Sequence, residues 1–223
     1  MDERIVMNEK IDKDISCYFD DVQDKERLMY GAVVKMVQEG FDMNSIKVSD
    51  ITKRAGIGKG TAYEYFGSKE EIIVKALLYD TFSHLKKIDS LLEEKNDFSD
   101  KYYILMNYLE DNISQVRSAG NIFKIFAGAP EAQENMKRQL EDIQKANACP
   151  VHYIEGMIDV FMQQGFDGGK FNEEDVIIRR SAFASQITGY IYCILNNFYN
   201  GKMDRQLARD FSYNGLIKLL TKS

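Results

Sequence analysis

The chain has 223 residues, of which 44% are hydrophobic, and its 35 acidic and 29 basic residues give a net charge of −6 at pH 7. This length suits a small module joined to a larger helical domain, and the hydrophobic fraction is sufficient for real cores. The negative charge argues against a protein that coats nucleic acid indiscriminately, because non-specific affinity depends on neutralising phosphates. Any contact with DNA is therefore expected to be local.

The cysteines and the start of the chain indicate a protein of the reducing cytoplasm. Cys17, Cys149 and Cys193 are far apart and have neither the paired spacing of a zinc site nor the density of a secreted disulfide scaffold. The first 14 residues are charged throughout and offer no apolar segment before a cleavage site, which argues against a secretory signal. We expect residues 1–23 to form an N-terminal arm.

Helical patterns cover almost the whole chain, and no alternating strand pattern persists. Gly40 is a stop signal for the first helix, and Ser68 with Glu71 has the spacing of a capping box. Pro150 suits a first helical turn, and Asn172 followed by Asp175 suits an N-cap. We expect an all-α fold with helices over residues 24–39, 48–55, two turns from 59, 68–92, 99–117, 122–126, 131–146, 151–164, 173–198 and 204–220.

The longest stretch without a charge is residues 181–201, SAFASQITGYIYCILNNFYNG. Serine, glutamine, threonine and asparagine interrupt it, whereas a membrane-spanning helix needs about 20 predominantly apolar residues. A helix that is buried on most sides is therefore the favoured interpretation.

The most informative segment is residues 48–71, which combine a helix, a glycine-rich turn and a short second helix. Gly56 can close the first of these helices in the left-handed conformation, and Gly58 allows a close approach of the backbone. In the helix that begins at Lys59, Ala62 and Phe66 fall on one face, whereas Gly60, Tyr63 and Glu64 point the other way. Five basic and two acidic residues between 45 and 69 make this segment a positive island.

The order and spacing of these residues resemble the DNA-binding domain of TetR-family transcriptional regulators. The resemblance covers about residues 25–72 and is carried by Gly40-Phe41, Val48-x-x-Ile51, the run from Ala55 to Phe66, and Ser68-Lys69-Glu70-Glu71. It implies an N-terminal three-helix helix-turn-helix domain over residues 24–70. It also implies a larger helical effector-binding and dimerisation domain over residues 71–223.

Transferred residue by residue, the resemblance implies a DNA-binding set of six residues. Lys59, Gly60 and Tyr63 are expected to touch bases or the groove, while Thr61, Tyr65 and Lys69 are expected to bind phosphates.

Two positions depart from the usual pattern. Glu64 places an acid beside DNA, where it can accept a hydrogen bond from cytosine or turn away toward Lys59 or solvent. Lys47 stands where a hydroxyl residue would usually cap the helix, so the cap is expected to shift to Ser45 or Ser49.

The aromatic and methionine side chains between residues 79 and 199 have two interpretations. Most of them are expected to be core, because a helical domain must bury such side chains. Some can line a cavity between helices, where apolar walls suit an adaptable ligand. The resemblance implies an effector pocket for an apolar or amphipathic small molecule, and our candidates are Tyr103, Phe123, Phe126, Met157, Phe161, Phe183 and Tyr190.

The last two helices predict a homodimer. Small residues spaced three and four apart in the penultimate helix allow another helix to come close, and the final helix has more apolar surface than one neighbour needs. Together they could form a four-helix bundle across a two-fold axis. The candidate interface residues are Ala182, Ser185, Gly189, Leu207, Phe211 and Leu216.

No catalytic set is evident in the sequence. His84 and His152 lack a carboxylate or cysteine at metal spacing, and residues 165–170 lack the pattern of a phosphate loop and are expected to form a turn. We expect no enzyme activity, no cofactor and no metal. The favoured function is a ligand-responsive repressor that binds a pseudo-palindromic operator as a homodimer, and the alternative is a helical dimeric ligand-binding or interaction protein that has lost DNA binding.

Overall fold

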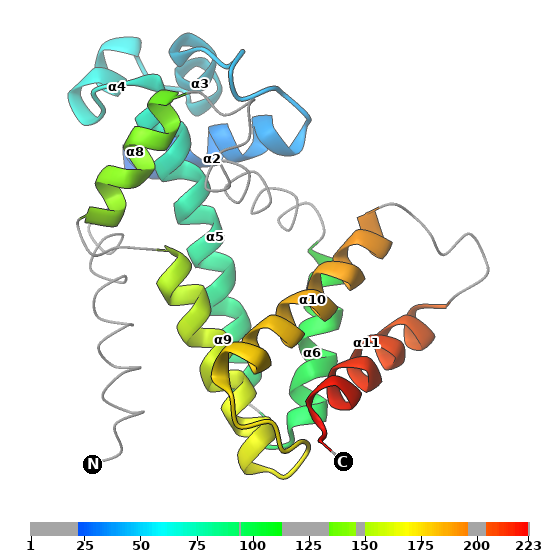
Figure 1. Cartoon of the computed structure of the whole chain (residues 1–223). Coiled ribbons are helices and arrows are strands. Elements are labelled where there is room, and N and C mark those ends of the chain that lie inside the picture. The colour runs from blue at the N-terminus through cyan, green and yellow to red at the C-terminus, as the bar shows by residue number, and fades with distance from the viewer. Residues whose placement is uncertain (1–21, 94, 113–133, 146–149, 196–203, 223) are drawn as a thin grey trace. The chain divides into compact units, whose positions relative to one another are not determined.

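The computed structural model describes residues 22–93, 95–112, 134–145, 150–195 and 204–222. Every regular element within these residues is an α-helix (Figure 1), which confirms the all-α prediction. Residues 22–86, 134–145 and 150 belong to one compact unit, here called the N-terminal unit, and the other described residues form the C-terminal unit. The predicted domain limits at residues 23 and 70 stay predictions, and residues 1–21 and the expected helix over 122–126 lie outside the described ranges.

The N-terminal unit contains α2 (Asp24–Gln38), α3 (Val48–Ala55), α4 (Lys59–Tyr65), the first part of α5 (Lys69–Glu93) and α8 (Glu134–Lys145). Helix α3 packs on α2 and on α4. The core of the N-terminal unit consists of aliphatic side chains with almost no exposed surface, among them Met29, Ile46, Ile51, Ile72 and Leu77. Burial of a large aliphatic side chain contributes about 1.5–3 kcal/mol, so this small core can hold three short helices in place.

Glycines in the left-handed conformation end two helices of the N-terminal unit. Gly40 has a φ of 90°, and the N–H of Phe41 donates to the carbonyl of Met36 at 3.0 Å. Gly56 has a φ of 69°, and the N–H of Ile57 donates to the carbonyl of Thr52 at 3.0 Å. These bonds satisfy carbonyls that would otherwise be orphaned. The left-handed turn predicted at Gly56 is confirmed, and it fixes the direction in which α4 leaves α3.

The C-terminal unit contains the end of α5, α6 (Phe98–Asp111), α9 (Pro150–Asp167), α10 (Val176–Leu195) and α11 (Arg205–Leu220). Helices α10 and α11 lie side by side and run in opposite directions (Figure 1), and α11 also packs on α6. Aromatic rings fill much of the core; the rings of Phe98 and Phe161, for example, have centroids 4.9 Å apart. Edge and tilted contacts of this kind stabilise beyond simple burial.

Three helix ends differ from their predicted positions. Helix α6 ends at Asp111 rather than at residue 117, because Asn112 leaves the helical conformation and its side-chain amide donates to the carbonyl of Tyr108 at 2.9 Å. Helix α10 begins at Val176 rather than at residue 173, because the N–H of Glu173 donates to the carbonyl of Leu220 at 3.0 Å and the carboxylate of Asp175 caps the helix. Helix α9 continues to Asp167 rather than ending at 164, so the turn expected over 165–170 starts later. Gly169, with a φ of 67°, closes α9 instead.

A buried carboxylate joins three helices of the C-terminal unit. Glu110 on α6 has a side chain that is 5% exposed, and it accepts two hydrogen bonds from the guanidinium of Arg209 on α11, at 2.9 and 2.7 Å. It also accepts a hydrogen bond from the hydroxyl of Tyr190 on α10. Burial tends to raise the pKa of Glu110, but the bonds from Arg209 and Tyr190 outweigh burial and hold this pKa below its ordinary value of 4.5.

No helix among the described residues is both long enough and apolar enough to cross a bilayer.

We expect Glu110→Gln to lower the free energy of unfolding at pH 7 by about 1–3 kcal/mol, because it removes charge-assisted hydrogen bonds from a buried site. An acid whose pKa is lowered on folding stabilises the protein above its unfolded pKa, and this contribution is lost as the pH falls. The difference between wild type and Glu110→Gln should therefore narrow below about pH 4.5. Urea unfolding at several pH values measures this difference in unfolding free energy, with Asp111→Asn at the exposed neighbouring residue as the control. A difference that is constant with pH would contradict the stabilising role of the Glu110 carboxylate.

Candidate nucleic-acid interface

Helix α4 presents one face to the core and the opposite face to solvent. Ala62 is fully buried and Phe66, directly after the helix, is 2% exposed. Tyr63 is 55% exposed, and Gly60 is also exposed, as is Lys59 at the first position of the helix. The division of faces expected from the sequence is thus what the structure has. Because α4 is only seven residues long, it can present few side chains to a partner, and its first turn carries most of them.

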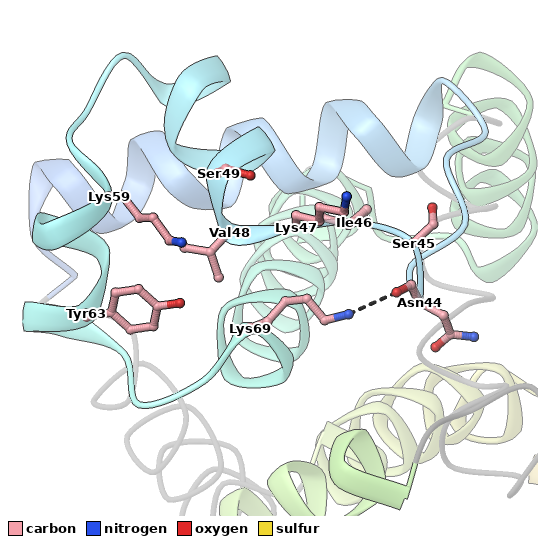
Figure 2. A pocket seen from close by; sticks show the side chains of 9 residues that line it. All are labelled: Asn44, Ser45, Ile46, Lys47, Val48, Ser49, Lys59, Tyr63 and Lys69. Atoms are coloured by element: carbon pink, nitrogen blue, oxygen red, sulfur yellow. Dashed lines mark hydrogen bonds between the residues drawn. The ribbon is translucent and has the colours of Figure 1, made fainter.

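A groove of about 600 Å³ lies between the solvent face of α4, the start of α3 and the start of α5. Figure 2 shows Lys59 and Tyr63 pointing from α4 toward the start of α3, while Lys69 points from α5 toward Asn44. We call this the lysine groove. Its lining consists of Asn44, Ser45, Ile46, Lys47, Val48, Ser49, Lys59, Tyr63 and Lys69.

The lining of the lysine groove is positively charged. Lys47, Lys59 and Lys69 contribute three ammonium groups, and no carboxylate is among the nine lining residues. Lys69 donates from Nζ to the carbonyl oxygen of Asn44 at 3.0 Å, and this nitrogen lies 3.8 Å from a carboxylate oxygen of Glu70. An ammonium group has three donors, so this bond leaves Lys69 able to contact an anion as well. The groove therefore suits a phosphate group.

The cap of α5 determines where Lys69 leaves the helix. The hydroxyl of Ser68 accepts a hydrogen bond from the N–H of Glu71 at 3.0 Å, as the capping-box spacing predicted. The carboxylate of Glu71 accepts from the N–H of Gly67 at 2.8 Å, one residue before the expected partner. Both bonds satisfy donors at the helix start. They hold Lys69 in the first turn, beside the groove.

The sequence did not determine how the helix start at Lys47 is capped. It occupies the N-cap position of α3, and its N–H donates to the carboxylate of Asp50 at 3.2 Å. The expected shift of the cap to Ser45 or Ser49 is wrong: the hydroxyl of Ser45 donates to the carbonyl of Asp42 at 2.8 Å instead. Asp50 supplies the missing capping interaction, which leaves the Lys47 side chain to line the groove. Lys47 was absent from the predicted DNA-binding set, although its position just before α3 was the available signal.

The other members of the predicted DNA-binding set lie outside the groove lining. Thr61 and Tyr65 are half-buried, and the ring of Tyr65 lies 6.4 Å from that of Phe66. Gly60 is exposed, and a Cβ atom added to it would meet no atom within 4 Å. The protein itself thus does not require glycine at position 60. A close approach of a partner to the backbone would explain its presence.

The candidate effector residues are only partly brought together. The rings of Phe161 and Phe183 lie 5.4 Å apart within the buried aromatic core of the C-terminal unit. Tyr103 donates from its hydroxyl to Asp210 at 2.5 Å, and Tyr190 is buried and bonded to Glu110. Met157 is half-buried on α9. The other two candidates, Phe123 and Phe126, lie outside the described residues.

The candidate dimer residues separate into two groups. Leu216 is fully buried within the protomer and Ala182 is 9% exposed. The four others are exposed: Phe211 at 70%, Leu207 at 51%, and also Ser185 and Gly189. The exposed residues are therefore the ones available to a partner subunit.

Comparison with known proteins concerns first the segment that contains the lysine groove. Residues 32–83, which include the lysine groove from Asn44 to Lys69, match the family model described as bacterial regulatory proteins, tetR family. No curated protein sequence matches the chain.

Solved structures share the fold over most of the chain. The fatty acid degradation regulator FadR from Bacillus halodurans is 19% identical, with a TM-score of 0.62 over 89% of this chain and 96% of its own. FadR from Bacillus subtilis, solved in complex with stearoyl-CoA, is 18% identical, with a TM-score of 0.57 over 86% and 96%. A putative transcriptional regulator from Saccharomonospora viridis, in complex with choline, is 13% identical, with a TM-score of 0.62 over 85% and 93%.

The helix-turn-helix and the helical body that follows it have the fold of a TetR-family transcription regulator. Residues 32–83 carry the DNA-binding domain of the tetR family of bacterial regulatory proteins.

The substitution Gly60→Ala is expected to affect protein stability and DNA affinity in opposite directions, so it distinguishes a folding role of Gly60 from a DNA contact. Alanine favours the helix over glycine by about 0.5–1 kcal/mol, and the added Cβ meets open space, so the variant should be slightly more stable than wild type. If DNA approaches the backbone here, the same methyl group should weaken DNA binding at least about tenfold, a loss of about 1.4 kcal/mol. Thermal unfolding and fluorescence anisotropy measure the two effects. Unchanged DNA binding would remove Gly60 from the interface.

Proposed function

We propose that this protein is a ligand-responsive repressor that binds a pseudo-palindromic DNA operator as a homodimer and is released by a small-molecule effector. The observation that carries the proposal is the lysine groove beside the exposed face of α4. Three lysines and one exposed tyrosine converge there on a chain whose overall charge is negative. Local positive charge of this kind supports a defined contact with DNA rather than general adhesion.

In the proposed complex, the N-terminal end of α4 enters the major groove. Tyr63 and Lys59 reach base edges or the groove wall, while Lys47 and Lys69 hold the phosphates on either side. Thr61 and Tyr65 are proposed as further phosphate contacts. Because phosphate contacts fix position and base contacts select sequence, the two-turn helix needs its lysine anchors to hold one register.

The proposed dimer uses the exposed side of the α10–α11 pair. Phe211 and Leu207 on α11 expose large apolar surfaces, and Ser185 and Gly189 give α10 a small-residue face that a second helix can approach. A two-fold axis through this surface would bring together two copies of each helix. It would also supply two copies of α4, as a pseudo-palindromic operator requires.

The proposed effector is an apolar or amphipathic small molecule that binds the C-terminal unit. The aromatic residues Phe161 and Phe183, with Met157, Tyr103 and Tyr190 around them, are the described candidates for its pocket. The regulators solved with stearoyl-CoA and with choline support ligand binding in this fold without identifying the ligand here. An effector changes DNA affinity only through its different affinities for two conformations, typically about 1–3 kcal/mol of coupling.

The alternative, a helical dimeric protein that has lost DNA binding, predicts a different result in one experiment. DNA from upstream of the protein's own gene should bind, and its affinity should fall steeply with salt concentration. Lys69→Ala and Lys47→Ala should each weaken binding and reduce the salt slope by about one, because each removes one phosphate contact. Lys35→Ala, an exposed lysine of α2 outside the groove, is the matched control. Absence of binding favours the alternative, whereas binding with equal slopes for all variants would remove Lys47 and Lys69 from the DNA interface.

Phe211→Asp tests the proposed dimer surface. A charge placed at the centre of an apolar interface should raise the dimer dissociation constant at least about tenfold. Sedimentation velocity at micromolar concentration should then show a dimer for wild type and a shift toward monomer for the variant. Leu28→Asp, on α2, makes the same kind of change at another apolar side chain with 51% exposure and should leave the dimer intact. A monomeric wild type would refute the proposed assembly.

A further inference from the structure

Arg179 is a buried positive charge of the C-terminal unit that has no acidic partner among the residues the structure describes. Arg179, in the first turn of α10, is 5% exposed. Its Nη2 atom donates to the side-chain oxygen of Gln163 at 3.0 Å, and its guanidinium carbon lies 5.0 Å from the centre of the Phe166 ring. Its Nε and Nη1 atoms are buried and have no hydrogen-bond partner. Glutamine and phenylalanine are both uncharged, so neither neutralises the arginine.

Four acids around the junction of α9 and α10 are engaged elsewhere, and a fifth, Glu174, is exposed to solvent. Among the described residues, none of them forms an ion pair with Arg179. Asp159 binds Arg180, Glu173 binds Lys222, Asp175 accepts from the first N–H groups of α10, and Asp167 accepts from Gln163. The last of these bonds orients Gln163, so that its oxygen faces Arg179.

A buried guanidinium without a counter-charge is unfavourable. Arginine stays protonated in proteins, so it cannot relieve the cost of burial by losing its charge. Buried charges are therefore almost always paired with an opposite charge, and a buried donor without a partner destabilises the folded state. The protein retains this arrangement although Arg180, the next residue, makes a complete two-bond pair with Asp159 at 3.0 and 2.6 Å.

We infer that Arg179 anchors a binding site for an anionic group, a carboxylate or a phosphate carried by a small molecule. A guanidinium offers two edges with two parallel N–H donors, one formed by Nε and Nη2 and one by Nη1 and Nη2. Gln163 uses one hydrogen of Nη2, and whichever hydrogen it takes, one complete edge remains. That edge matches two oxygens of a carboxylate or a phosphate. The ring of Phe166 covers one face of the guanidinium and keeps it in this place.

This site goes beyond the proposed function, since it requires neither DNA nor a dimer. Its test is the thermal stability of the whole protein in sodium phosphate and in sodium acetate, each compared with sodium chloride at equal ionic strength. A ligand that binds only the folded state raises the melting temperature with its concentration. At ten times the dissociation constant of the probe, the expected rise is about 3–6 °C. A response to phosphate alone indicates a phosphate-bearing ligand, and a response to acetate alone indicates a carboxylate.

Two variants assign the response to Arg179. Arg179→Gln removes the charge and should abolish the anion effect, while circular dichroism reports whether the variant folds. Arg179→Lys keeps the charge but replaces the two-donor edge by a single ammonium, and it should lose most of the effect even if the glutamine variant does not fold. Arg180→Lys is the matched control and should respond like wild type. The inference is overturned if neither probe stabilises wild type beyond chloride, or if Arg179→Lys responds as strongly as wild type.

Discussion

The interaction on which the proposed DNA-binding face depends is the packing of Ala62 and Phe66 against the core of the N-terminal unit. These two side chains hold one face of α4 inward, and the left-handed turn at Gly56 sets the angle at which that helix leaves α3. A seven-residue helix is too short to be stable alone, so its orientation comes from this packing together with the turn at Gly56. The outward direction of Tyr63 and the position of Lys59 follow from it.

Electrostatics complements this geometry. In the proposed complex, the negative net charge of the chain disfavours general adhesion to nucleic acid, while the lysine groove offers a local attraction. The bond from Lys69 to the carbonyl of Asn44 joins the start of α5 to the segment before α3. Lys69 therefore both connects two walls of the groove and contributes a positive charge to its lining. Acids lie close by without lining the groove: Asp50 caps α3 at Lys47, and Glu71 caps α5 at Gly67.

Local signals in the sequence predicted the helix-turn-helix well, because glycine conformations and caps act over a few residues. Gly56 and Ser68 are examples whose roles the structure bears out. Contacts between distant residues were not predictable in this way. The start of α10 was misplaced because the carbonyl of Leu220 binds the N–H of Glu173, and no local pattern reports such a bond. Arg179 and Arg180 are likewise adjacent and chemically identical in the sequence. Only the fold shows that Arg180 is paired with acids while Arg179 is buried without them.

The central claim is that two copies of α4 face DNA together, with their first turns outward. Selection of bound sequences from a random double-stranded DNA pool tests this claim most directly, because it requires no knowledge of the operator. The account predicts an enriched inverted repeat whose half-sites are separated by one helical turn, about 10 base pairs, or a multiple of it. A pool without enrichment, or an enriched single site without two-fold symmetry, would contradict it.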